Sequence, residues 1–382
     1  MQNYYHTLYF ETTRNCNFSC PYCSTGSTYK KHYPDLSYET IRDRILIPAY
    51  DLGTRLIDFS GGEFLLRKDA FDLLELAHKL GYQIAMASNG STLTDTTLKE
   101  IKSIVGDNII ISLGINSFDD LNIKTRTVET QYALDILEKL KRYDIRTNIS
   151  ITLSQLNKST FSTTVKNLSK FSLPFNRIPF VPRSCNRHDL MFDKAALRDY
   201  FHPVLHKYWN GQVSYIPYFL PQTEYERVSG QYLNKEKIPL NPSVGCWVGA
   251  YYAINPEGEV SPCPMFLDHV TGGNVLDTPL KDILFKSDLF TKIVQRDKLK
   301  GKCGKCRYKY TCGGCRVMAY YLTGDVYAED PTCFIDELNE EQIQEIEQTT
   351  ITSFKNYLRM AKFGNIFKKN DVNQGTLKSS NH

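Results

Sequence analysis

Apolar stretches of strand type alternate with longer amphipathic stretches through the first half of the chain. The predicted strands are Tyr5–Thr12, Leu56–Ser60, Gln83–Ala87, Ile109–Leu113, Thr147–Leu153 and Arg177–Val181. The predicted helices are Tyr38–Leu52, Lys68–Leu80, Thr94–Ile104, Glu129–Tyr143, Ser159–Ser172 and Lys194–Trp209. This alternation favours an α/β fold with a parallel sheet and helices on its outer face. Because such sheets bind ligands at the carboxyl ends of their strands, chemistry is expected in the residues that follow each strand.

A short loop after the first predicted strand carries three cysteines, Cys16, Cys20 and Cys23, at the spacing C-x3-C-x2-C. Three thiolates can hold three irons of a four-iron cluster and leave the fourth iron open to a chelating molecule. A structural zinc site needs four ligands, and this loop has no fourth Cys or His. A disulfide between two of these cysteines would leave the third thiol unpaired. The loop therefore indicates an iron–sulfur cluster with an open position.

The net charge of +4 over 382 residues is too small to indicate a nucleic acid or an anionic membrane as a partner. The sequence shows no signal peptide and no apolar run that approaches the length of a membrane span. We therefore expect a cytoplasmic protein with two domains, or with one large domain and an appendage. In a reducing compartment, clustered cysteines indicate metal binding or catalysis rather than disulfides.

Polar motifs follow the next three predicted strands. They are Ser60-Gly61-Gly62-Glu63 after the second strand, Ser88-Asn89-Gly90 after the third, and Ser112-Leu113-Gly114 after the fourth, with Arg126 farther along. Two glycines let a backbone approach a ligand closely, and a carboxylate can accept hydrogen bonds from an ammonium group. Each motif alone is a common turn. Their shared position at strand ends indicates a binding site.

With the cysteine loop and the six strand–helix units, these motifs resemble the radical S-adenosylmethionine (radical SAM) family, which folds as a partial (β/α)6 TIM-like barrel. The resemblance implies that Cys16, Cys20 and Cys23 hold a [4Fe–4S] cluster whose open iron binds the amino and carboxylate groups of SAM. The resemblance implies that Gly61, Gly62 and Glu63 hold the methionine amino group of SAM, and that Ser88 and Asn89 also contact SAM. It implies that Ser112 and Arg126 reach the ribose and carboxylate, and that the backbone of Tyr22 meets the adenine. Gly114 stands where the family usually has Asp, so the alternative for Arg126 is a solvated residue at the start of a helix.

A second set of cysteines lies toward the C-terminus, at Cys246, Cys263, Cys303, Cys306, Cys312, Cys315 and Cys333. The motifs Cys-Gly-Gly-Cys-Arg and Asp-Pro-Thr-Cys resemble those of the SPASM domain, an extension that carries two auxiliary [4Fe–4S] clusters. The resemblance implies an outer cluster on Cys303, Cys306, Cys312 and Cys333. It implies an inner cluster on Cys246, Cys263 and Cys315, which is one ligand short. A zinc ribbon is the alternative. Pro256-Glu257-Gly258 predicts the turn of a two-stranded hairpin inside this region.

These patterns divide the chain into a barrel core over residues 1–182, a helix and bridging segment over 183–245, a SPASM domain over 246–335, and a C-terminal helix with a frayed tail over 336–382. Helical spacing predicts that last helix over Leu338–Lys362. Cys185 follows the sixth predicted strand. A lone cysteine is usually a small buried apolar residue. Its functional alternatives are an extra cluster ligand or a hydrogen-atom donor to a substrate radical.

The resemblance implies an enzyme with three [4Fe–4S] clusters that cleaves SAM reductively to a 5′-deoxyadenosyl radical, with an electron donor such as flavodoxin or ferredoxin. The first interpretation is a maturase that crosslinks, oxidises or epimerises a peptide. Because the cysteine loop begins at Cys16, that interpretation requires a separate leader-peptide-binding protein. The alternative is oxidation of a small molecule such as a tetrapyrrole or a sugar alcohol. A third interpretation, a non-enzymatic iron–sulfur or zinc protein, is disfavoured by the intact Gly61-Gly62-Glu63 motif.

Overall fold

A computed structural model describes residues 5–21, 23–28, 30–208, 216–232 and 244–362. Its centre is a sheet of strands in the order β6-β5-β4-β3-β2-β1-β7-β8-β9. The first six strands are β1 (Thr7–Glu11), β2 (Leu56–Ser60), β3 (Gln83–Ser88), β4 (Ile109–Gly114), β5 (Arg146–Leu153) and β6 (Phe175–Pro179). Each pairs in parallel with the next. The predicted parallel α/β fold is confirmed, although β6 begins two residues before its predicted start because Phe175 pairs with Ile149.

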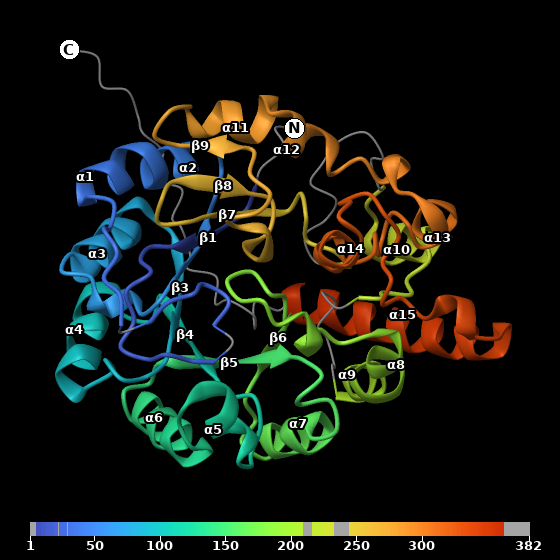
Figure 1. Ribbon diagram of the computed structural model, residues 1–382, viewed down its shortest axis with the longest axis horizontal. Helices are drawn as coiled ribbons and strands as arrows, with labels where there is room; N and C mark the ends of the chain where they lie inside the picture. Colours follow the sequence, from blue (N-terminus) through green and yellow to red (C-terminus); the bar gives the residue numbers. More distant parts are fainter. Residues whose placement is uncertain (1–4, 22, 29, 209–215, 233–243, 363–382) are drawn as a thin grey trace.

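The helices of this half are α1 (Tyr38–Thr40), α2 (Ile47–Asp51), α3 (Ala70–Leu80), α4 (Asp95–Val105), α5 (Leu121–Arg126), α6 (Thr130–Arg142), α7 (Phe161–Lys170), α8 (Lys194–Ala196) and α9 (His202–Tyr208). Figure 1 shows the strands as an arc with α3, α4, α6 and α7 outside it. Two predicted helices contain π-helical turns, at Ile41–Leu46 and Leu197–Phe201. Helix α5 was not predicted, because its six residues carry no apolar stripe long enough to detect.

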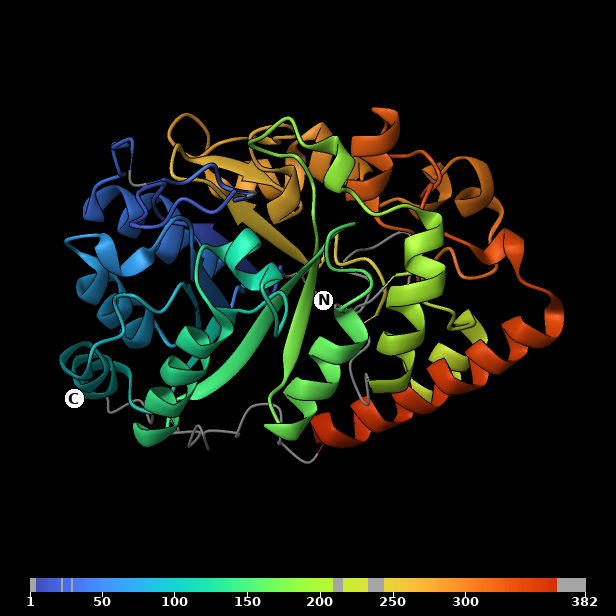
Figure 2. The same ribbon diagram turned by 60° about the horizontal axis from the view of Figure 1, so that its bottom comes forward.

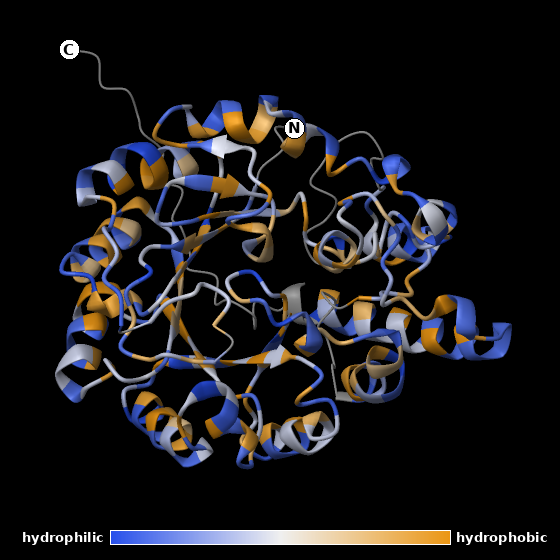
Figure 3. Ribbon diagram, viewed as in Figure 1, coloured by the Kyte–Doolittle hydropathy of each residue, from blue (hydrophilic) through white to orange (hydrophobic). Residues whose placement is uncertain are grey.

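The two faces of the strands differ because side chains alternate along each strand. Residues such as Leu8, Phe10, Ile57 and Phe59 are fully buried and belong to the hydrophobic core beneath the outer helices. Figure 3 shows hydrophobic and hydrophilic residues alternating along those helices, as expected when one side of a helix is buried. The opposite, inner face of the same strands is largely polar and less completely buried. It carries Tyr9, Asp58, Ser112, Asn148 and Ser150.

The C-terminal half continues the same sheet. Strand β7 (Tyr251–Ile254) pairs in parallel with β1, and β8 (Glu259–Ser261) and β9 (Gly273–Asn274) follow in antiparallel pairing. The hairpin predicted around Pro256-Glu257-Gly258 is therefore confirmed. Because β7 occupies the free edge of β1, the backbone groups of that edge are paired rather than left open. The sheet runs without a break across the domain boundary predicted at residue 246.

The remaining helices are α10 (Gln222–Ser229), α11 (Leu280–Lys286), α12 (Asp288–Lys292), α13 (Gly301–Lys305), α14 (Arg316–Thr323) and α15 (Glu340–Lys362). Helix α15 confirms the predicted C-terminal helix and runs along one side of the molecule (Figure 2). It packs against α10 through the stacked rings of Phe354 and Tyr225, whose centroids lie 5.4 Å apart. The predicted tail beyond residue 362 lies outside the described residues. No described helix is both long enough and apolar enough to cross a membrane.

A network of charged side chains joins the two halves. Arg183 donates to both oxygens of Glu11 at 2.6 Å, and neither side chain is more than 1% exposed. Arg183 and Arg14 both donate to Asp268, and Arg14 also pairs with Glu257 in the hairpin turn. Burial alone would raise the pKa of Asp268, but the hydrogen bonds and charges of the two arginines lower it to about 2. The network therefore connects β1, the segment before the cysteines and the hairpin.

Replacing Arg183 with Met would leave Glu11 buried without its partner. We expect Arg183→Met to lower the free energy of unfolding by about 3–5 kcal/mol, because removal of one member of a buried ion pair leaves an uncompensated charge. Chemical denaturation at equal iron content measures the change. The matched control is Arg187→Met, which removes an arginine from an exposed pair with Asp189 and should change stability little. Equal effects of the two variants would contradict the structural role of Arg183.

Candidate active site and cysteine groups

The three N-terminal cysteines lie on the loop that follows the carboxyl end of β1. Burial raises the pKa of Cys16 to about 11, and the neighbouring charges of Glu63, Cys23 and Cys20 contribute to the rise. The structure thus brings these three predicted thiols into one electrostatic neighbourhood. No group of three or more His, Cys, Asp or Glu suited to a single metal ion occurs among the described residues. An iron–sulfur cluster needs its thiolates farther apart than one ion does.

The Gly61-Gly62 pair allows the end of β2 to approach the cysteine loop. The amide of Gly62 donates to the Thr13 carbonyl at 2.7 Å. A Cβ on Gly61 would lie 2.3 Å from the same oxygen, and one on Gly62 would lie 2.1 Å from the Asn15 carbonyl oxygen. Gly61 also has a φ of +125°, which disfavours other residues. The close approach that the glycines permit is to the chain's own loop.

Glu63 joins the ends of β2 and β3. Its side chain is fully buried and accepts hydrogen bonds from the Ser88 hydroxyl at 2.8 Å, the Asn89 amide at 2.8 Å and the Thr92 hydroxyl at 2.9 Å. Burial raises the pKa of Glu63, and these donors partly offset the rise. A carboxylate has about four positions for hydrogen-bond donors. Three are used here, so one remains for an ammonium group.

Asn89 extends this arrangement to the cysteine loop. Its side-chain amide donates to Asn17 Oδ1 at 3.0 Å and lies 3.7 Å from Cys16 Sγ. Ser88 is committed to Glu63 and to the amide of Gly90. The structure therefore brings the motifs after β1, β2 and β3 together. Tyr22, the residue predicted at the adenine, lies outside the described residues.

Arg126 ends α5 and lies over the carboxyl end of β4. A Cβ on Gly114 would lie 2.1 Å from Arg126 Cζ, so glycine at this position makes room for the guanidinium. Arg126 Nε is buried and has no hydrogen-bond partner among the residues that the structure describes. Its backbone carbonyl accepts from Cys20 Sγ at 3.7 Å. The alternative of a solvated arginine at a helix start is therefore wrong, because the guanidinium is held against the strand end at the last residue of the helix.

Ser112 lies on the inner face of β4 and accepts a hydrogen bond of 3.4 Å from the Asn148 amide. Asp58 occupies the same inner face, on β2. Asp58 was not among the predicted site residues, although an acid in the centre of the apolar strand Leu-Ile-Asp-Phe-Ser is a detectable signal. Burial raises the pKa of Asp58 to about 7. Its Oδ1 is buried and has no hydrogen-bond partner within the described ranges.

Cys185 lies beside the cysteine loop. Its neighbour Ser184 donates to the carbonyl of Cys23 at 2.6 Å. Burial raises the pKa of Cys185, and Cys23 is among the charges that act on it. The side chain is only partly buried. Cys185 is therefore not the fully buried apolar residue that a lone cysteine usually is, and it lies close to the predicted cluster.

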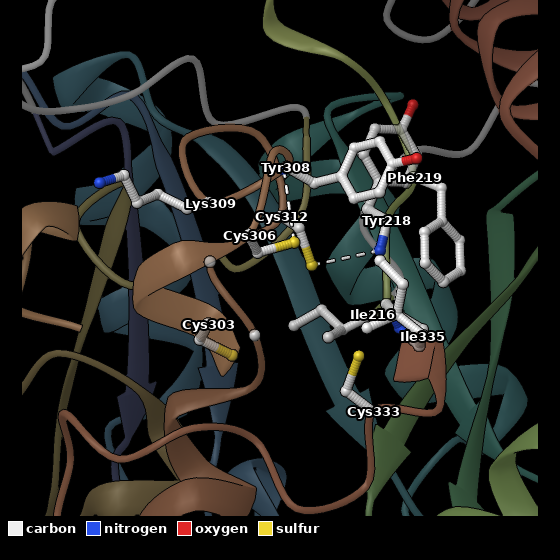
Figure 4. A pocket seen from close by; sticks show the side chains of 13 residues that line it. Ile216, Tyr218, Phe219, Cys303, Cys306, Tyr308, Lys309, Cys312, Cys333 and Ile335 are labelled. Atoms are coloured by element: carbon white, nitrogen blue, oxygen red, sulfur yellow. Dashed lines mark hydrogen bonds between the residues drawn. The ribbon is translucent and has the colours of Figure 1, made fainter. Parts of the chain in front are cut away.

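The four predicted outer cysteines, Cys303, Cys306, Cys312 and Cys333, line one pocket with an empty volume of about 340 Å³. Figure 4 shows their sulfur atoms directed toward a common space. Backbone amides approach the sulfurs: Tyr218 N lies 3.2 Å from Cys312 Sγ, and Asp330 N lies 3.3 Å from Cys303 Sγ. Tyr218 belongs to the segment over residues 183–245, in which Cys185 was the predicted site residue and Tyr218 was not selected. Amide donors to sulfur are a means by which proteins stabilise and tune iron–sulfur clusters.

The three predicted inner cysteines form another neighbourhood. Burial raises the pKa of Cys315, and the charges of Cys246 and Cys263 contribute. Burial also raises the pKa of Cys263 to about 12. The hydroxyl of Tyr251, on β7, lies 3.1 Å from Cys263 Sγ. Asp330 accepts from the Cys315 amide at 2.7 Å and so connects the inner cysteines with the outer group.

The donor set fits iron–sulfur clusters. Ten cysteines fall into three neighbourhoods, and backbone amides contact sulfurs of the outer group. Arg126, whose Nε has no hydrogen-bond partner among the described residues, contacts Cys20 of the cysteine loop through its backbone carbonyl. Thiolates are the ligands that iron–sulfur clusters require. The described residues therefore suit the groups that the sequence predicts.

Comparison with known proteins gives two family matches, the radical SAM superfamily over residues 10–168 and the SPASM iron–sulfur cluster-binding domain over residues 246–307. The AdoMet-dependent heme synthase of Methanosarcina barkeri is 26% identical over 87% of this chain and 97% of its own length. The pre-heme d1 synthase of Dinoroseobacter shibae is 28% identical over 90% of this chain and 89% of its own length.

Solved structures of two enzymes share the fold. SuiB of Streptococcus suis bound to S-adenosylmethionine superposes with a TM-score of 0.64 at 17% identity, covering 87% of this chain and 77% of SuiB. The enzyme anSMEcpe with bound AdoMet superposes with a TM-score of 0.63 at 16% identity, covering 94% of this chain and 95% of its own. The matched regions contain the cysteine loop, the strand-end motifs and the start of the second cysteine set. This chain belongs to the radical SAM superfamily and carries a C-terminal SPASM domain.

Proposed function

We propose that this radical SAM enzyme oxidises a small molecule, and that the substrate is a tetrapyrrole. The observation that carries the proposal is the similarity to the AdoMet-dependent heme synthase of Methanosarcina barkeri over 97% of that enzyme's length. The similarity to a pre-heme d1 synthase supports it independently. Peptide modification, the first interpretation of the sequence, has no comparable support. The likeness to SuiB, at 17% identity, concerns the fold alone.

Cys16, Cys20 and Cys23 would hold the cluster, which with bound SAM would supply a 5′-deoxyadenosyl radical to remove a hydrogen atom from the substrate. The chain's own residues bind and orient SAM. Glu63 keeps one hydrogen-bonding position for the ammonium group, and the unpartnered Nε of Arg126 suits the carboxylate. An electron donor of the flavodoxin or ferredoxin type would deliver the electron. The two SPASM cysteine groups would hold auxiliary clusters, for a total of three.

The inner face of the sheet is the proposed substrate site. It lies next to the strand ends that carry the SAM motifs and presents polar side chains, among them Tyr9, Asp58 and Ser150. Asp58 Oδ1 is buried and has no hydrogen-bond partner among the described residues. Because a buried polar atom without a partner is costly, we infer that a polar group of the substrate completes its hydrogen bonding.

Incubation of the reconstituted, dithionite-reduced enzyme with SAM and a panel of tetrapyrroles tests the substrate proposal. We expect one tetrapyrrole to stimulate formation of 5′-deoxyadenosine, to transfer deuterium from a labelled side chain into it, and to change in mass by oxidation. Cys20→Ala is the negative control and should form no 5′-deoxyadenosine, because one of the three cluster thiolates is missing. Stimulation and deuterium transfer by a peptide, with none by any tetrapyrrole, would restore the peptide interpretation.

Arg126→Met should raise the KM for SAM about tenfold or more, because a charge-assisted hydrogen bond contributes about 1.5–3 kcal/mol. The rate of 5′-deoxyadenosine formation against SAM concentration measures this change, and iron content per chain verifies that the cluster is intact. Lys124→Met, on the exposed side of the same helix α5, removes a positive charge away from the site and serves as the matched control. An unchanged KM in Arg126→Met would exclude contact with SAM.

Asp58→Asn should remove a pH-dependent loss of stability. The raised pKa of about 7 means that the folded protein favours the neutral acid, so wild-type stability falls as the pH rises from about 4 through 7. The stability of Asp58→Asn relative to wild type should therefore increase between pH 5 and pH 8, by roughly 2 kcal/mol. Denaturation at the two pH values measures it, with the exposed Asp51→Asn on α2 as the control. An equal change in both variants would contradict a buried acid at position 58.

A further inference from the structure

Arg296 is a buried cation whose charge no described carboxylate balances. It begins a short turn between α12 and α13 and is 3% exposed. One guanidinium nitrogen, Nη2, donates to the carbonyl of Cys246 at 3.1 Å. The other two, Nε and Nη1, are buried and have no hydrogen-bond partner in the described part of the chain. Arg296 forms no ion pair with any Asp or Glu in the described part of the chain.

A buried guanidinium without a balancing negative charge lowers the stability of the folded protein unless a bound anion lies beside it. Arginine stays protonated, and a buried charge is normally paired and hydrogen-bonded. The charges that act on Arg296 come from Cys246 of the inner group and Cys312 of the outer group, and from a second cation, Arg316. The side chain therefore requires an anion, and both candidate sources are predicted cluster thiolates.

The position of the guanidinium is set by the backbone of the outer group. A Cβ on Gly313 would lie 2.4 Å from Arg296 Cζ, and Gly313 has a φ of +74°. The guanidinium thus lies directly against the residue after Cys312, while its Nη2 contacts Cys246. Arg316, also fully buried, differs because it is held by the carbonyls of Val326 and Ala328 and reaches only toward Cys303 of the outer group, at 3.9 Å.

We propose that Arg296 is the shared counter-charge of the two auxiliary clusters, placed between them, and that it raises the reduction potentials of both. The proposal rests on the auxiliary clusters of the proposed function. A [4Fe–4S] cluster on cysteine thiolates carries a net negative charge, and its reduction adds another. A fixed cation nearby favours the reduced form, since cluster potential follows net charge and hydrogen bonding at the site. Through one side chain, both clusters become better electron acceptors.

The test uses the full-length chain with Cys16, Cys20 and Cys23 all replaced by Ala, so that after reconstitution only the auxiliary clusters titrate. Redox titration followed by EPR gives the two midpoint potentials. In this background Arg296→Met should move both potentials to more negative values. Arg296→Lys keeps the charge, so both potentials should stay close to those of the background with Arg296 intact. Arg307→Met is the matched control, because it removes an arginine next to Cys306 that is half-exposed and paired with Glu347.

Iron content separates the possible failures. If the triple-Ala background holds far fewer than about eight irons, the auxiliary clusters of the proposed function are wrong. If it holds them and Arg296→Met moves neither potential, or only one, the shared counter-charge is wrong. A shift of equal size in Arg296→Lys also overturns the proposal, because charge would not be the cause. Loss of iron in Arg296→Met with retention in Arg296→Lys supports a charge that the clusters require.

Discussion

The ion pair between Glu11 and Arg183 is the interaction on which the arrangement of the two halves depends. Glu11 is the last residue of β1, immediately before the segment that leads to the cysteines, and Arg183 follows β6. Arg183 also donates a hydrogen bond to Asp268, which accepts another from Arg14, two residues before Cys16. A buried network of this kind is stable only when each charge has its partners. It therefore constrains the cysteine loop, the end of the barrel and the SPASM hairpin together.

Contacts within the chain place the strand-end motifs before any ligand binds. Backbone bonds from Gly62 and Glu63 hold the cysteine loop against β2, and the Glu63 carboxylate holds β3. Most hydrogen bonds of the site are thus already made, and few groups are left over. In the proposed function, the fourth position of Glu63 would accept from the ammonium group of the ligand, and Nε of Arg126 would donate to its carboxylate. Preorganisation of this kind reduces the cost of ordering the site on binding.

Strand pairing and a side-chain contact also connect the second cysteine set to the barrel. Strand β7 extends the sheet beside β1, and Tyr251 on that strand contacts the inner thiol Cys263. The inner thiol Cys263 therefore lies at the sheet itself, and the outer cysteines line a pocket to which residues 216–219 of the bridging segment also contribute. The buried Arg296 lies between the two groups.

The sequence by itself determined the features that depend on neighbouring residues. The six strands, the cysteine spacings, the Gly-Gly-Glu motif and the hairpin at Pro256 are local patterns, because side-chain periodicity and turn chemistry act over a few residues. Only the tertiary structure decided which distant groups meet. Glu11 and Arg183 are 172 positions apart, and β7 joins β1 across more than half the chain. Arg296 looks ordinary in sequence, whereas Asp58 stands out as an acid inside an apolar strand. Both become significant through buried polar atoms that have no hydrogen-bond partner among the described residues, which depends on every element packed around them.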